Sequence, residues 1–368
     1  MTTQKVRVAV NGYGVIGKRI ADAIAIQDDM ELVGVADVVS DWRIKVAVEK
    51  GYPVFASTPE AADQMRAAGI QVAGNLDDLL GKIDAVADAT PKKVASANLE
   101  KYRASGIKSI FQGGEKHSLT GHSFVAQANY ETALGRDTTR VVSCNTTSIV
   151  RTLGALKAAG LLKKARGVLV RRATDPWESD HSGVMNTVVP ETIIPSHQGP
   201  DAQTVDPDLD VVTIALVAAH TTSHLHAWSV ELTRPATKEE VLDAFRSAPR
   251  IAFLRASEGV VALNSTLEMM ADLGMSLFSD SVTITGQQKC HLDGCRRLSI
   301  IGVTPNGRRD GIFPRGPSRL LFSVFAFRFI RSAPSIWQTA AYARDDRKLA
   351  YRAGGLGASS PVSVRSAS

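Results

Sequence analysis

A glycine-rich segment near the N-terminus constrains the fold more than any other feature of this chain. A β-branched run at residues 6–10 leads directly into a G-x-G-x-x-G pattern at residues 12–17, and a helical stretch follows. In such a segment Gly12 permits a tight turn, Gly14 lets the backbone approach a pyrophosphate, and Gly17 lets the helix lie close to the strand. The phosphates then meet the helix N-terminus. The segment therefore predicts a dinucleotide-binding domain.

The end of the next strand indicates which dinucleotide is bound. A second apolar run, residues 30–36, ends at Asp37, twenty residues after Gly17. A carboxylate at this position accepts hydrogen bonds from the ribose hydroxyls of NAD and repels the additional phosphate of NADP. We therefore expect NAD as the cofactor, with NADP as the alternative.

The order of strand and helix patterns predicts two domains. Short strands are expected at 54–55, 70–72, 83–88 and 107–111, with helices between them, and Thr90 follows one of these strands where the cofactor crevice should open. Longer strands are expected at 167–172 and 210–216, and an amphipathic helix at 238–245. We predict an α/β fold: a Rossmann domain with a doubly wound parallel sheet over residues 1–142, and a catalytic α+β domain with a mostly antiparallel sheet over residues 143–286.

One cysteine lies where a nucleophile would be built. Cys144 stands between short polar residues, just before a helix that is expected to begin at Ser148. A helix N-terminus stabilises the thiolate, which is the nucleophilic form of cysteine. Taken alone, Cys144 could equally be a small buried apolar residue.

Three histidines follow at positions compatible with a second catalytic group. His220, His224 and His226 lie between two runs that read as strands, and in an extended chain all three share one face. A metal site is conceivable, but no carboxylate or cysteine interleaves with them. A single general base beside Cys144 fits better, with at least one of the other imidazoles serving the interior structure.

Five sequence blocks occur in an order that resembles one enzyme family. They are residues 11–14 (Asn-Gly-Tyr-Gly), 111–116 (Phe-Gln-Gly-Gly-Glu-Lys), 141–147 (Val-Val-Ser-Cys-Asn-Thr-Thr), 170–173 (Val-Arg-Arg-Ala) and 195–197 (Pro-Ser-His). The chain thus resembles the archaeal class of phosphorylating glyceraldehyde-3-phosphate dehydrogenase over about residues 5 to 285. The resemblance implies an oxidoreductase of glycolysis and gluconeogenesis that uses NAD or NADP, takes glyceraldehyde 3-phosphate and inorganic phosphate, and usually forms a homotetramer.

The resemblance also implies roles for individual residues. Cys144 matches the nucleophile, and His224 matches the catalytic base. Cofactor contacts are expected from Gly12, Gly14, Val15, Ile16, Gly17, Asp37, Thr90, Gly114 and Arg172. Substrate contacts are expected from Ser143, Asn145, Thr146, Gln198 and Gly199, with Arg171 and Thr147 as further phosphate partners. Gln198 departs from the histidine that the family usually has, and Asp37 departs from the lysine or small residue of many relatives.

Two alternatives to this function remain open at the level of sequence. Another cysteine-dependent semialdehyde dehydrogenase, such as the aspartate-semialdehyde type, would share the fold and the thioester chemistry. A cofactor-binding remnant, inactivated by an altered C-terminus, would keep the dinucleotide site alone.

Composition favours a cytoplasmic enzyme. No apolar run reaches the length that spans a membrane, and the first residues enter a strand without resembling a signal peptide. The chain has three cysteines, one of them assigned to chemistry, which argues for a reducing compartment rather than a disulfide framework. We expect neither a membrane nor nucleic acid as a partner, and no resident metal.

The last part of the chain, residues 287–368, departs from the family. It holds 12 Arg and 2 Lys against 4 Asp and no Glu, so its formal net charge is +10, whereas the preceding residues carry −4. A basic arm for nucleic acid, or a metal site at Cys290 and Cys295, would be alternatives. We favour an altered reading frame near residue 287, because glutamate disappears abruptly. Translation of the gene in the other two frames should recover the missing family blocks.

Overall fold

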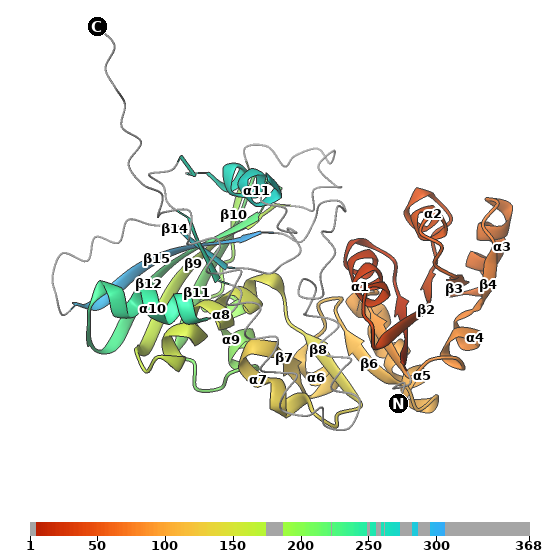
Figure 1. Ribbon diagram of the computed structural model, residues 1–368, viewed down its shortest axis with the longest axis horizontal. Coiled ribbons are helices and arrows are strands. Elements are labelled where there is room, and N and C mark those ends of the chain that lie inside the picture. The colour runs from red at the N-terminus through yellow and green to blue at the C-terminus, as the bar shows by residue number, and fades with distance from the viewer. Residues whose placement is uncertain are drawn as a thin grey trace, which may run out of the picture.

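The computed structural model describes residues 5–173, 187–221, 223–248, 251–254, 259–260, 262–272, 282–285 and 295–305. Figure 1 shows two groups of strands, one in the N-terminal part of the chain and one in the C-terminal part, each with its own helices. None of the described helices is both long and apolar enough to cross a bilayer.

The N-terminal part is a parallel sheet that is wound in both directions from its first strand. In the sheet the strands are ordered β4-β3-β2-β1-β5-β6-β8-β7, and every pair is parallel. Their bounds are β1 (Val6–Asn11), β2 (Met30–Asp37), β3 (Val54–Ala56), β4 (Val72–Asn75), β5 (Ala85–Asp88), β6 (Lys108–Phe111), β7 (Ser123–Phe124) and β8 (Thr138–Val141). The order reverses between β1 and β5, and ligands of such sheets bind outside the carboxyl ends of the strands at this point.

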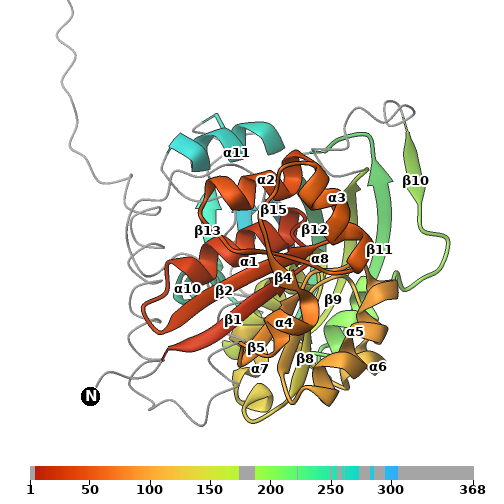
Figure 2. The same cartoon turned by 90° about the vertical axis from the view of Figure 1, so that its right-hand side faces the viewer.

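Helices cover both faces of this sheet, as its apolar strands require. Alternate residues of β1 belong to different apolar clusters: Val8 and Val10 pack with α1, α2 and α3, whereas Ala9 packs with α4 and α5. Figure 2 shows these helices around β1 and β2. Their bounds are α1 (Val15–Ala25), α2 (Trp42–Glu49), α3 (Pro59–Ala67), α4 (Leu76–Leu80), α5 (Lys92–Ala104), α6 (His117–Thr120) and α7 (Ala126–Ala133). The predicted doubly wound domain is confirmed.

The C-terminal part is a mixed sheet in the order β10-β11-β9-β12-β15-β14-β13. Four of its strand pairs are antiparallel, while β11 with β9 and β13 with β14 are parallel. The strands are β9 (Leu162–Arg172), β10 (Val188–Pro190), β11 (Val211–Ala218), β12 (Ser223–Ala236), β13 (Ile251–Leu254), β14 (Val282–Thr285) and β15 (Cys295–Pro305). The helices are α8 (Cys144–Ala158), α9 (Gln198–Gln203), α10 (Lys238–Ser247) and α11 (Leu263–Asp272). The predicted mostly antiparallel sheet is therefore confirmed.

One face of this second sheet packs on α8. Ile149, Leu153 and Leu156 of the helix share an apolar cluster with Leu169 of β9 and Trp228 of β12. The helix thereby runs along the sheet that carries His224 and His226. This packing decides which side chains of β12 can reach the N-terminus of α8.

Part of the basic tail belongs to the second sheet. Residues 295–305 form β15, which pairs with β12 and β14 inside the second sheet. Cys290 and residues 306–368 lie outside the described residues, as does the proposed frame alteration near residue 287. Strand β15 of the second sheet thus lies beyond the boundary that we predicted at residue 286.

Candidate active site

Cys144 is the first residue of α8. The side chain of Ser143 caps the helix by accepting the backbone N–H of Thr146 at 3.2 Å. The helix therefore begins four residues earlier than the sequence suggested, because the short polar residues that disfavour a helix interior stabilise its first turn. Cys144 remains partly exposed. Its sulfur stands at the positive end of the helix dipole, where a thiolate is stabilised.

His224 lies directly beside this sulfur. Its Nε2 is 3.2 Å from Sγ of Cys144, and its Nδ1 accepts the backbone N–H of Arg172 at 3.3 Å. Burial lowers the pKa of His224 well below its usual value, and the nearby Arg172 guanidinium lowers it further. The ring is therefore neutral, and since Nδ1 accepts a hydrogen bond, we assign its proton to Nε2. An N–H aimed at Sγ stabilises the thiolate.

The other two histidines separate in space. His226 shares the inner face of β12 with His224, and its Nε2 bonds Oδ1 of Asn145 at 2.9 Å, which ties the strand to the first turn of α8. His220 instead lies in the turn before β12, so the expectation that all three share one face is wrong. The strand begins only at Ser223. Among the described residues, no group of histidine, cysteine or carboxylate side chains could hold a metal ion.

A partly exposed carboxylate organises several residues that were expected to bind substrate or phosphate. Glu191 pairs with Arg171, and its other contacts are His197 Nδ1 at 3.3 Å and Gln198 Nε2 at 3.5 Å. Burial raises the pKa of Glu191, but the charges of His197 and Arg171 outweigh this effect and lower it overall. Gly199 donates its backbone N–H to Thr213 Oγ1 at 3.0 Å. Arg171 and Gln198 are therefore held near one another by a residue that the sequence patterns did not single out.

The glycine turn at the switch point fits a dinucleotide. A Cβ on Gly17 would lie 1.8 Å from the carbonyl oxygen of Gly12, and one on Gly12 would lie 2.8 Å from the backbone of Thr90. A Cβ on Gly14, in contrast, would meet nothing within 4 Å. Helix α1 has neither a side-chain cap nor an acidic residue in its first turn. Its N–H groups, including those near Val15 and Ile16, are thus suited to a pyrophosphate.

Two other predicted cofactor residues already have partners. The Asp37 carboxylate accepts the backbone N–H groups of Tyr13 at 2.5 Å, Val38 at 2.6 Å and Val39 at 3.2 Å. The hydroxyl of Thr90 donates to the buried Asp88 at 2.5 Å. Asp37 therefore holds the glycine loop in addition to any ribose, and Thr90 turns its hydroxyl toward the interior. Gly114, with φ of 90°, lies exposed after β6.

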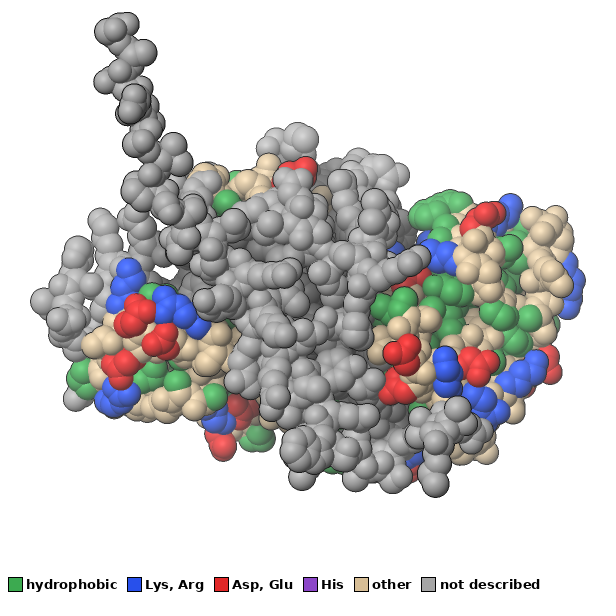
Figure 3. Space-filling view, in the orientation of Figure 1, with side chains coloured by type: hydrophobic (Ala, Val, Ile, Leu, Met, Phe, Trp, Pro, Cys, Tyr) green, Lys and Arg blue, Asp and Glu red, His purple; other side chains and the backbone are tan. Residues whose placement is uncertain are grey.

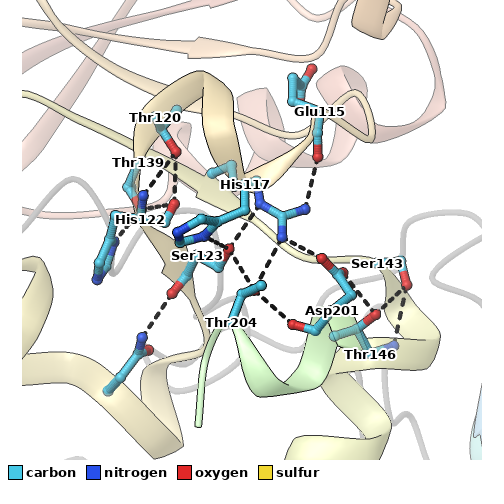
Figure 4. A network of polar contacts seen from close by, with 12 residues as sticks. Glu115, His117, Thr120, His122, Ser123, Thr139, Ser143, Thr146, Asp201 and Thr204 are labelled. Carbon is cyan, nitrogen blue, oxygen red and sulfur yellow. Dashed lines mark hydrogen bonds and ion pairs between the residues drawn. The ribbon is translucent and has the colours of Figure 1, made fainter. Parts of the chain in front are cut away.

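The sequence patterns missed Asp201, Thr204 and Ser123, which meet two predicted substrate residues beside Cys144. Figure 4 shows Asp201 of α9, Thr204 just after it, Ser123 of β7, Thr146 of α8 and the helix cap Ser143 in one polar network. Arg140 of β8 joins them through an ion pair with Asp201. The sequence signal that could have revealed this network was Arg140, a charged residue within a short strand of a largely buried parallel sheet.

Two buried histidines predict that acid destabilises the protein. Burial lowers the pKa of His226 to about 3 and, together with the charges of Arg136 and His117, that of His122 to about 4. Below about pH 6.5, which is the ordinary histidine pKa, both imidazoles are protonated in the unfolded chain but stay neutral in the folded chain. Proton binding therefore favours the unfolded chain, and the free energy of unfolding decreases as pH falls from about 6.5 toward the pKa values of the folded state. We expect urea unfolding to show a loss of about 2–3 kcal/mol between pH 7 and pH 5.5.

The matched variant is His122→Gln, which replaces one buried imidazole with a group that does not titrate. This change should remove about 1 kcal/mol of the loss between pH 7 and pH 5.5. Equal unfolding free energies for the wild type at the two pH values would contradict the neutral state of these side chains.

Comparison with known proteins identifies the family. The profile of the glyceraldehyde 3-phosphate dehydrogenase C-terminal domain matches residues 143–292, and that of the dihydrodipicolinate reductase N-terminus matches residues 6–114. The glyceraldehyde-3-phosphate dehydrogenase of Methanobrevibacter smithii is 40% identical over 304 residues, which cover 80% of this chain and 90% of the relative. The chain belongs to the glyceraldehyde-3-phosphate dehydrogenase family.

Other relatives agree with this family. The glyceraldehyde-3-phosphate dehydrogenase of Methanothermobacter thermautotrophicus is 45% identical over 272 residues, covering 74% of this chain and 80% of the relative. Among solved structures, aspartate semialdehyde dehydrogenase II of Vibrio cholerae has a TM-score of 0.62 at 12% identity, and the match covers 89% of this chain and 97% of that one. At this low identity the similarity establishes the common fold of the two enzymes.

Proposed function

We propose that this family member is an NAD(P)-dependent, phosphorylating glyceraldehyde-3-phosphate dehydrogenase. The observation that carries the proposal is the 3.2 Å contact between Cys144 Sγ and His224 Nε2 at the N-terminus of α8. A thiolate nucleophile, a hydrogen-bond donor beside it and a dinucleotide crevice are the parts that this oxidation requires. The Rossmann domain comprises residues 1–142, and the catalytic domain begins at residue 143.

The first step is attack of the Cys144 thiolate on the aldehyde carbon of glyceraldehyde 3-phosphate. A sulfur–carbon bond forms, and the electron pair of the carbonyl moves to its oxygen. Nε2–H of His224, which faced the sulfur, is placed to stabilise this alkoxide. When bound, NAD(P) supplies the acceptor for the hydride that leaves the same carbon. Cys144 then carries a thioester. With its proton on Nε2, His224 serves this step as a hydrogen-bond donor, in place of the base that the resemblance implied.

The second step is attack of inorganic phosphate on the thioester carbon. The carbon–sulfur bond breaks, the acyl phosphate 1,3-bisphosphoglycerate leaves, and the thiolate is restored with the stabilisation of the same helix N-terminus. Arg172 lies close enough to His224 for its charge to lower the pKa of that ring, and its backbone N–H bonds Nδ1 of His224. Phosphate binding is assigned to Arg171, Thr146 and Thr147, and Arg172 is assigned to the cofactor.

The deciding experiment follows NAD reduction with glyceraldehyde 3-phosphate in the presence and absence of phosphate or arsenate. The proposed function requires steady turnover that depends on the oxyanion. Oxidation with no such dependence, or none at all despite cofactor binding, would instead favour the remnant. Activity with aspartate semialdehyde in place of glyceraldehyde 3-phosphate would favour the other class that shares this fold.

Asp37 leads to a prediction of cofactor preference. Its partly exposed carboxylate ends β2 and already accepts three backbone N–H groups, so a 2′-phosphate placed there would meet a fixed negative charge. We expect the wild type to bind NAD more tightly than NADP. Asp37→Asn, which keeps an acceptor oxygen for the N–H of Tyr13 and loses the charge, should narrow the difference. Asp37→Ser should narrow it too, but at a cost to NAD affinity, because the glycine loop loses its anchor.

Titration of both cofactors into wild type and the two variants, followed by protein fluorescence, measures this preference. Equal affinity of the wild type for NAD and NADP would show that the carboxylate does not face the ribose.

We also propose a homotetramer in the cytoplasm. The outer face of the second sheet exposes Val168 of β9 and Ile214 of β11, which pair directly, and the β10 region exposes Val188 and Ile193. Such apolar faces are buried in oligomers. The chain has three cysteines, one of them assigned to chemistry, which favours a reducing compartment. On the face shown in Figure 3, positive and negative side chains of the described residues are interspersed, which favours small molecules over nucleic acid as partners.

A further inference from the structure

A buried guanidinium joins the two domains beside Cys144. Arg140 of β8 donates from Nε to Ser123 Oγ at 2.8 Å, from Nη1 to the carbonyl oxygen of Glu115 at 2.7 Å, and from Nη2 to Thr204 Oγ1 at 3.2 Å. Nη2 also pairs with the carboxylate of Asp201 on α9. The Arg140 side chain is only 5% exposed. Its contacts therefore fix one point of the first sheet against α9.

The hydrogen bonds that continue from Asp201 have a fixed direction. The hydroxyl of Thr146 lies 3.0 Å from Asp201 Oδ2, and because a carboxylate only accepts, Thr146 donates. The oxygen of Ser143 lies 2.9 Å from that of Thr146, so the Ser143 proton points to Thr146. A lone pair of Ser143 is thereby directed at the backbone N–H of Thr146, which is the cap of α8. Figure 4 shows this path from Asp201 to Ser143.

The same guanidinium also reaches the cofactor side of the site. Its partner Glu115 closes a turn in which both carboxylate oxygens accept the backbone N–H of Gly113 at 3.1 Å. A Cβ on Gly113 would lie 1.9 Å from the carbonyl oxygen of Thr90, so this turn packs directly against the backbone of a predicted cofactor residue. Arg140 thus binds the turn that contains Gly114 directly. Through Asp201 and Thr146 it is also linked to α8, which carries the nucleophile.

A purely stabilising role explains this arrangement less well. Removing two charges from water costs free energy that their attraction only partly returns, so a buried pair contributes little net stability. Its geometric effect is larger, because a two-pronged guanidinium fixes orientation as well as distance. We propose that Arg140 and Asp201 are positioning residues, which keep the capped first turn of α8, and with it Cys144, in register with the cofactor turn. This inference deepens the proposed function and rests on it.

The test compares two variants that break the path at different points. Thr146→Val removes the hydroxyl link without changing any charge, and Asp201→Asn removes the ion pair. Each should slow alkylation of Cys144 by iodoacetamide at pH 7 by about threefold to tenfold, which corresponds to the loss of a helix cap. Each should lower kcat by a similar factor or more, with the KM for NAD changed less than about twofold. Because both act through one path, the double variant should be no slower than the slower single variant.

Two controls separate positioning from general destabilisation. Thr146→Ser keeps the hydroxyl and should recover most of the alkylation rate that Thr146→Val loses. Asp206→Asn breaks the 2.5 Å contact with Lys157 at the other end of α8, and should lower Tm while leaving alkylation at the wild-type rate. Unchanged alkylation in both single variants, or effects that multiply in the double variant, would overturn the proposal. Alkylation needs neither aldehyde nor phosphate, so the result stands apart from the outcome of the turnover assay.

Discussion

Replacing Cys144 with serine is expected to abolish turnover, by a factor of about 10⁴ or more, which is typical for loss of a nucleophile. Sulfur is required because a serine hydroxyl is not ionised by a helix N-terminus at neutral pH, whereas a thiol is. NAD affinity should change little, since the glycine loop and α1 belong to the first sheet, whereas residue 144 begins α8 beside the second sheet. The measurement is NAD reduction together with a cofactor titration on the same preparation.

Chemical labelling provides the matched control for this variant. Iodoacetate should modify Cys144 faster than Cys290 or Cys295, because Cys144 is the residue at the start of α8 and beside His224. Labelling of the Cys144→Ser protein should be correspondingly slow. Equal labelling rates at all three positions of the wild type, or a serine variant that turns over, would contradict an activated thiol at residue 144.

The fold could be predicted because its signals are local. The G-x-G-x-x-G segment requires a strand, a turn and a helix in immediate succession, and each of the following strands is a short apolar run between helices. The reversal of strand order at β1 then follows from the fold class. In the same way, the position of Cys144 near a helix start was predictable from its neighbours, because small polar residues before an apolar run mark the beginning of a helix.

The contacts between distant residues could not be predicted. Arg140 and Asp201 are 61 residues apart, and no pattern in either segment indicates that they meet. The separation of His220 from His224 depends on where β12 begins, which is set by pairing with β9 and β15 rather than by the alternation of polar and apolar residues. The inward turn of the Thr90 hydroxyl likewise depends on the buried Asp88 two residues earlier. Cross-strand and interdomain geometry, not residue type, decides these details.

Replacing His224 with asparagine is the second change with a large expected effect. We expect kcat to fall by about 10²–10⁴, the range for loss of a proton-transferring group or an oxyanion donor. Burial holds the pKa of His224 well below 6.5, so in the wild type this ring stays neutral as pH falls from 7.5 to 6, and its protonation should not cause an inflection near the ordinary histidine pKa. A group with a depressed pKa loses its function only when pH falls through that lower value.

A second readout of His224→Asn tests the assigned proton on Nε2. If Nε2–H stabilises the thiolate, its loss raises the pKa of Cys144, and the midpoint of iodoacetamide alkylation should move to higher pH in the variant. His220→Asn is the matched control, because His220 lies in the connection that leads to β12, outside the strand that places His224 beside Sγ. If kcat instead depended on His226 and tolerated the change at residue 224, the imidazole that bonds Asn145 would be the reacting group, and the 3.2 Å contact with Cys144 would have no catalytic role.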